Sequence, residues 1–151
     1  MKVQEESAAT ALSLPLAFPI GLPGFETYHS FHLVGLGPAY GPYLGLRCAI
    51  DEGPTFVVVQ PSEIGITLEL EIDDFHQALL GIKDASEVLV MLIATLREEK
   101  AFPTVNTQAP LVINVTNWKV AQVSQSNAEY RLDQEAEVAF YDAERAIAAL
   151  R

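Results

Sequence analysis

Residues 55–60 read Thr-Phe-Val-Val-Val-Gln and are followed by Pro61. β-Branched and aromatic side chains are enriched in β-strands, because they pack well on a pleated surface. A proline offers no N–H to a strand ladder, so Pro61 ends the run. This stretch therefore predicts a strand, and the Asp-Glu-Gly-Pro sequence before it predicts a turn.

Similar short apolar runs lie on both sides of this stretch. Residues 66–72 alternate Ile or Leu with Thr or Glu, which predicts a half-buried strand with Glu69 and Glu71 on its polar face. Turn residues recur about every ten positions, a spacing that favours a closed or nearly closed antiparallel β-barrel of seven or more strands. The further strands expected are residues 31–36, 43–50, 88–96, a segment from 105, and a hairpin of 111–115 with 118–123.

Two helices are predicted. Asp73 and Asp74 can cap a short helix that ends at Gly81. Residues 132–150 contain no Gly or Pro and place apolar side chains at spacings of three and four, as in an amphipathic helix. That helix could pack on its own barrel or be offered to another protein or copy. The fold class is mostly β: a small antiparallel β-barrel-like domain over residues 1–131, with one short internal helix, and a C-terminal helical extension over 132–151.

The charge balance excludes several function classes. The 151 residues carry 20 acids and 9 bases, a net charge of -11, and residues 26–87 alone hold 10 acids and 2 bases. Such a surface repels phosphates, so direct nucleic-acid binding and a polybasic membrane-surface mode are not expected. The single cysteine, Cys48, fits a reducing compartment and a packing role. No apolar run is long enough to span a bilayer, and we expect a cytoplasmic protein without cofactors.

The sequence shows little catalytic chemistry. His29 and His32 are three apart in a predicted strand, where they would point to opposite faces, so a metal site is not expected. His76 is interpreted as a surface residue. The polar residues that stand out are amides beside strands and prolines, which suit hydrogen bonding and recognition rather than acid–base catalysis. A non-enzymatic binding protein follows.

Several motifs together resemble the flagellar assembly factor FliW family over about residues 15–132. They are Phe-Pro-x-Gly-Leu-Pro-Gly-Phe-Glu at 18–26, Phe-Val-Val-x-x-Pro at 56–61, Thr-x-Asn-x-x-Ala-Pro-x-Val-Ile-Asn at 104–114, Gln-Val at 122–123 and Tyr-Arg-Leu at 130–132. Residues 1–14 depart from the family pattern, so the resemblance does not define a first strand there. The tail from Asp133 extends beyond the family's usual ending.

The resemblance implies a small β-barrel-like regulator that binds flagellin and the RNA-binding translational repressor CsrA. Excess flagellin would occupy such a protein and leave CsrA free to repress flagellin translation, whereas flagellin export would release it to antagonise CsrA. An RNA-binding partner carries basic surface, which the acidic balance would complement. The expected partner-binding residues are Gly21, Pro23, Gly24, Phe25, Gln60, Pro61, Glu69, Glu71, Asn106, Pro110 and Asn114. The alternative is that the prolines and glycines only hold turns and the asparagines only satisfy backbone groups.

Two other functions are compatible with the residues alone. A small-molecule enzyme or carrier would need a pocket with convergent polar groups. A structural module would self-associate through a terminal stripe of Phe140, Ala143, Ile147 and Leu150.

Overall fold

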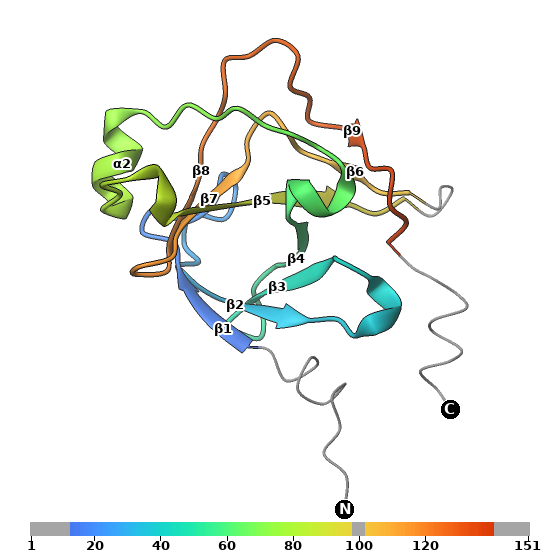
Figure 1. The fold of residues 1–151 in the computed structure, drawn as a ribbon. Coiled ribbons are helices and arrows are strands. Elements are labelled where there is room, and N and C mark those ends of the chain that lie inside the picture. Colours follow the sequence, from blue (N-terminus) through green and yellow to red (C-terminus); the bar gives the residue numbers. More distant parts are fainter. Residues whose placement is uncertain (1–12, 98–101, 141–151) are drawn as a thin grey trace, which may run out of the picture.

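The computed structural model describes residues 13–97 and 102–140 (Figure 1). Within those ranges the chain forms nine strands, one α-helix and three short 3-10 turns. The strands are β1 Ser13–Ala17, β2 Ser30–Gly35, β3 Leu44–Cys48, β4 Thr55–Val59, β5 Val88–Thr95, β6 Thr104–Val105, β7 Leu111–Asn114, β8 Lys119–Gln122 and β9 Gln134–Glu135. The helix is α2 Asp74–Leu80, and the 3-10 turns are η1 Pro38–Tyr40, η2 Pro61–Ile64 and η3 Ala85–Glu87.

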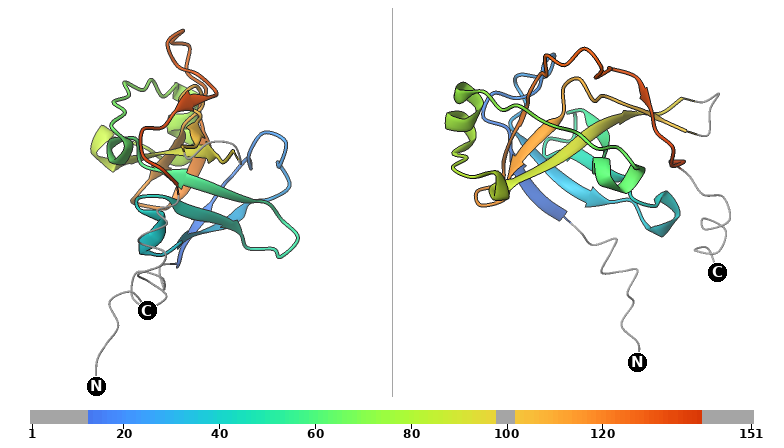
Figure 2. Two further views of the ribbon diagram at one scale, coloured as in Figure 1. Left: turned by 90° about the vertical axis from the view of Figure 1, so that its right-hand side faces the viewer. Right: turned by 45° about the horizontal axis from the view of Figure 1, so that its top comes forward.

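Seven of these strands close a barrel. β1 to β4 form an antiparallel meander, β4 pairs with β5, and β5, β7 and β8 continue antiparallel. The ring closes where Ala17 of β1 pairs in parallel with Lys119 of β8. β6 joins the far end of β5, and β9 adds to β6. The segment that carries β9 crosses the side of the barrel where β5 and β6 lie, as both views in Figure 2 show.

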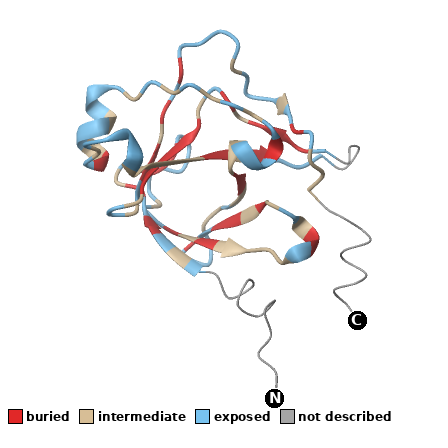
Figure 3. Ribbon diagram, viewed as in Figure 1, coloured by how far each residue is buried: buried red, intermediate tan, exposed pale blue. Residues whose placement is uncertain are grey.

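Both faces of several strands are buried, which explains their unbroken apolar sequences (Figure 3). In β4, Val58 belongs to the cluster inside the barrel, whereas Val59 belongs to an outer cluster. The interior cluster takes side chains from all seven barrel strands, together with Phe18 and Leu22. Two outer clusters lie under the covering segments: one includes Ile64, Ala136 and Phe140, and the other includes Leu80 of α2.

Most sequence-based predictions of the fold are confirmed. The strand at 55–60, the long strand from Val88 and the 111–123 hairpin are present within one or two residues of the expected bounds. The α2 helix begins after Asp73, whose carboxylate accepts a hydrogen bond from the His76 N–H, and ends at Gly81. β1 begins at Ser13, where the resemblance had defined no strand.

Residues 66–72 were wrongly predicted as a strand. Their apolar side chains do face the outer clusters, as the alternation indicated. However, the segment pairs with no strand in the described ranges, and along one edge the side chains of Tyr130 and Gln125 bond to its main chain instead.

The helix predicted from residue 132 is also wrong over the residues described. Gln134–Glu135 form β9, and the Ala136 N–H donates to the carbonyl of Pro103 at 3.0 Å. Phe140 packs against Tyr40 and Tyr43, with ring centroids 5.1 and 5.7 Å away. The remaining residues of that prediction, 141–150, lie outside the described part of the chain.

Candidate partner-binding surface

The turn at residues 18–26 requires its first glycine. Gly21 has φ 68°, and a Cβ atom there would lie 2.7 Å from the Cα of Glu26. Gly24 also has a positive φ, but a Cβ atom there would meet nothing within 4 Å. The turn is fastened by a hydrogen bond from the Phe25 N–H to the Leu22 carbonyl at 2.7 Å. Gly21 is buried, and its role is to let the chain turn close to Glu26. Pro23 and Gly24 are exposed, so a partner could contact them.

Phe25 lies on this exposed turn, with 38% of its surface accessible. One side of its ring meets Phe56 in an edge-to-face arrangement, with centroids 5.4 Å apart. An aromatic ring that is half packed and half exposed is a common anchor for a partner. The Gly24 N–H donates to the carboxylate of Glu26 at 3.0 Å and lowers the pKa of that acid below its usual value.

The predicted asparagines serve the fold. The Asn106 side-chain oxygen accepts from the N–H groups of Gln108 and Ala109, each at 3.0 Å. Asn114 is fully buried; its amide donates to the Leu80 carbonyl at 2.8 Å, and its oxygen accepts from Thr116. Pro110 is buried as well. The prediction that Asn114 and Pro110 meet a partner directly finds no support in their positions.

Glu69 and Glu71 are exposed on a segment whose main chain is firmly held. The Tyr130 hydroxyl accepts from the Glu69 N–H at 2.9 Å and donates to the Glu69 carbonyl at 3.0 Å. The Gln125 side chain forms the same pair of bonds with Glu71, at 2.9 and 3.0 Å. Two side chains thus reproduce the contacts of a neighbouring strand, and they hold the main chain that carries the two glutamates.

Gln125 was missed by sequence reasoning, and Tyr130 was noted only as part of a motif. Both lie more than 50 positions from the residues they bind. The available signal was weak: an aromatic and an amide in a stretch without strand character.

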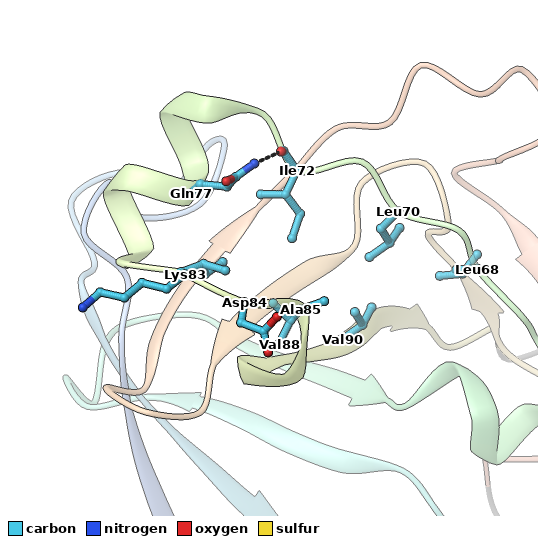
Figure 4. Close-up of a pocket in the computed structure, with 10 residues that line it drawn as sticks. Leu68, Leu70, Ile72, Gln77, Lys83, Asp84, Ala85, Val88 and Val90 are labelled. Atoms are coloured by element: carbon cyan, nitrogen blue, oxygen red, sulfur yellow. Dashed lines mark hydrogen bonds between the residues drawn. The ribbon is translucent and has the colours of Figure 1, made fainter.

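Gln60 and Pro61 lie where β4 leaves the barrel, and they line one end of a groove. One part of this groove has a volume of about 490 Å³ and is lined by residues of η2, residues 65–68, Leu70 and residues of β5. A second part, of about 400 Å³, continues toward α2 and η3. Figure 4 shows Leu68, Leu70 and Ile72 directed from one side and Val88 and Val90 lining the other. We call this feature, shared by both parts at Leu68, Leu70, Val88 and Val90, the strand groove.

The predicted residues therefore fall into separate groups. The exposed turn around Phe25 is one, and the strand groove with the neighbouring Glu69 and Glu71 is another. Asn106, Pro110 and Asn114 form a third group that supports loops and the core. The structure does not bring all of them to one surface.

No group of three or more His, Cys, Asp or Glu side chains in the described residues could hold a metal ion. The closest acid–histidine pair is Asp73 and His76, 2.7 Å apart, where bonds from the His76 main chain and ring lower the pKa of Asp73. That pair caps α2. No helix in the same residues is long and apolar enough to cross a bilayer.

A family model described as FliW protein matches residues 2–136 of the chain. The chain belongs to the FliW family. Among proteins named Flagellar assembly factor FliW, that of Treponema pallidum is 32% identical over 111 residues, covering 74% of this chain and 73% of the relative. That of Bacillus velezensis is 33% identical over 115 residues, covering 76% and 80%. A crystal structure of the flagellar assembly factor FliW superposes with a TM-score of 0.72 at 27% identity, covering 89% of each chain.

The comparison confirms the family expected from the motifs and the mostly β fold. The FliW match includes the 18–26 turn, the strand groove and the segment of Glu69 and Glu71. It ends at residue 136, just after β9. The division into a domain at 1–131 and an extension at 132–151 stays a prediction.

Proposed function

We propose that this chain is a non-enzymatic flagellar assembly factor that binds flagellin and antagonises CsrA by protein–protein contact in the cytoplasm. Membership of the FliW family supports the flagellar role. The observation that carries the CsrA part is the pair of exposed carboxylates at Glu69 and Glu71, on main chain that Tyr130 and Gln125 hold in place.

Fixed acids suit this task for a physical reason. A basic surface that binds RNA through its phosphates is attracted to an acidic protein, and complementary charge raises the association rate and selects the partner. Because the main chain at both glutamates is already ordered, binding loses little backbone entropy there. An acidic face held over a basic RNA-binding surface also repels RNA at the same time.

The exposed turn around Phe25 supports the flagellin part of the proposal. Phe25 is the only one of the predicted partner-binding residues with an exposed aromatic side chain. We assign flagellin to this turn and CsrA to the acids, so that the two contacts are separable by mutation.

The test is a charge-reversal titration. The variant Glu69→Lys with Glu71→Lys should weaken CsrA binding about tenfold or more in low salt and leave flagellin binding mostly intact. The matched control reverses Asp51 and Glu52, two exposed acids in the β3–β4 turn, and changes net charge equally. Unchanged CsrA affinity in the first variant, or equal weakening in the control, would refute the assignment.

A pull-down from the native cell tests the partners themselves. Recovery of flagellin or CsrA with the tagged chain is the expected result. Recovery of neither from flagellated cells would contradict the proposed function, whatever the charge variants show.

Two earlier alternatives lose support. Packed side chains from all seven barrel strands occupy the interior, which leaves no basis for a ligand site there. The terminal stripe that would drive self-association starts at Phe140. The ring of Phe140 packs on Tyr40 and Tyr43 of its own barrel.

A further inference from the structure

The strand groove lies between two segments whose main chains are incompletely bonded. On one side, residues 66–72 form a segment in which the main-chain groups of Glu69 and Glu71 are bonded to the side chains of Tyr130 and Gln125. The main-chain groups of Leu68 and Leu70 form no hydrogen bond with any residue in the described ranges. Successive residues of an extended chain direct these groups to alternate sides, so Leu68 and Leu70 present theirs away from the Tyr130 and Gln125 side.

On the other side, β5 has an open edge along its first half. The carbonyls of Glu87 and Ile93 accept from Val115 and Asn106, on the β7 and β6 side. By the same alternation, Val90 directs its N–H and C=O to the opposite side. β4 occupies that side only as far as the pair Val59 with Leu92. The main-chain groups of Val90 therefore face the strand groove.

Apolar side chains and acids complete the groove. Leu68, Leu70, Val88 and Val90 provide apolar walls at alternate positions of their segments. Residues 60–90, which supply its lining and borders, contain seven acids and one lysine. An occupant must offer strand hydrogen bonds, apolar side chains at every second position and positive charge.

We propose that the strand groove receives an extended, basic segment of a partner protein, which adds as a strand to the open edge of β5. Strand addition satisfies unpaired main-chain groups on a sheet edge, and alternate side-chain pockets give specificity. The Tyr130 and Gln125 side chains already hold the main chain of residues 69–71, on the side of the groove opposite β5. The groove therefore loses little conformational entropy when the segment binds. This inference adds a main-chain contact to the charge contact proposed above, and it depends on neither partner's identity.

The test uses the full chain and a fluorescein-labelled peptide, KVKVTVK, in an anisotropy titration. Matched peptides are N-methylated at every second residue, in both phases, and an acidic peptide, EVEVTVE, controls for charge. We expect saturable binding of the basic peptide below about 1 mM, at least tenfold loss for one methylated phase, and no binding of the acidic peptide. Equal binding of the basic peptide and both methylated forms, or no saturation, would overturn the proposal.

Variants of the chain test the same edge from the other side. Val90→Pro removes one N–H that faces the groove and is tolerated at an open strand edge, whereas Val90→Ala keeps the N–H. We expect at least tenfold weaker peptide binding for V90P and about twofold to threefold for V90A. Equal effects would assign the binding to side-chain contact alone and reject strand addition. The titrations with methylated peptides are done on the unaltered chain. If V90P does not fold, those titrations alone decide the proposal.

Two further outcomes separate this proposal from other occupants. Concentration-dependent dimerisation of the free chain that V90P abolishes would give the groove to a second copy and overturn the proposal. Peptide binding by a chain that captures neither flagellin nor CsrA would contradict the proposed function and leave the strand groove intact.

Discussion

The Leu80 carbonyl at the end of α2 is held by two asparagine side chains from the β7–β8 hairpin. Asn114 donates to it at 2.8 Å and Asn117 at 2.9 Å. No other donor in the described chain reaches this oxygen. The last carbonyls of a helix lack partners within the helix, so this arrangement ties α2 to the barrel. We predict that the two asparagines are energetically coupled through their shared acceptor.

The magnitudes follow from burial. Asn114→Ala removes a fully buried amide and its bonds to Leu80 and Thr116, and we expect a loss of about 2 kcal/mol in the free energy of unfolding. Asn117→Ala removes an exposed amide, and we expect about 1 kcal/mol. In each single variant the Leu80 carbonyl keeps one donor. The double variant orphans a buried oxygen, so its loss should exceed the sum by about 1 kcal/mol.

Urea unfolding followed by circular dichroism measures these differences, with the fluorescence of Trp118, the only tryptophan, as a second probe. The double-mutant cycle decides the point. Additivity within about 0.3 kcal/mol would refute the shared-acceptor reasoning. Because Asn114 is buried, folded N114A should keep the affinity of the unaltered chain for whichever of the proposed partners that chain binds, and a specific loss of binding would contradict the structural role.

Three further predictions test other features. Gly21→Ala should destabilise the fold by about 2 kcal/mol or more, and Gly24→Ala by about 1 kcal/mol, since both have positive φ but only the first creates a clash; equal thermal shifts would contradict this. Tyr130→Phe should accelerate amide hydrogen exchange at Glu69 about tenfold while leaving the barrel strands protected; unchanged exchange would disprove that the Tyr130 hydroxyl holds this main chain. The pKa of Asp73 is lower in the folded state than in the unfolded state. Its contribution to stability is therefore complete above the pKa of the unfolded state and is lost as the pH falls through the pKa of the folded state. Asp73→Ala should therefore weaken the acid dependence of stability below about pH 4, and an unchanged dependence would contradict the cap.

The sequence predicts best where local pattern and tertiary environment agree. The β-branched run of β4 and the long run of β5 become strands with both faces buried. Asp73 and Gly81 bound α2 because cap chemistry depends on a few neighbouring residues. The Gly-Leu-Pro-Gly-Phe turn was expected for the same local reason.

Where prediction failed, distant contacts decided the outcome. Residues 66–72 have the alternation of a strand, but the main-chain partners of Glu69 and Glu71 are side chains more than 50 positions away. The helical spacing from Leu132 onward is overridden by pairing of β9 with β6 and by packing of Phe140 on Tyr43. Asn114 was expected at a recognition surface, because sequence does not distinguish an amide that satisfies buried groups from one that meets a partner.

The parallel contact between Ala17 and Lys119 has a consequence for how the chain folds. It joins strands about 100 positions apart, whereas β1 to β4 and the β7–β8 hairpin connect near neighbours. The entropy lost on closing a loop rises with the length of chain enclosed. Pairing of β1 with β8, which we call the seam, therefore costs the most entropy if it forms early. We expect the local sheets to form first and the seam to close last. A chain emerging from the ribosome then completes its barrel only after the β7–β8 hairpin has been synthesised.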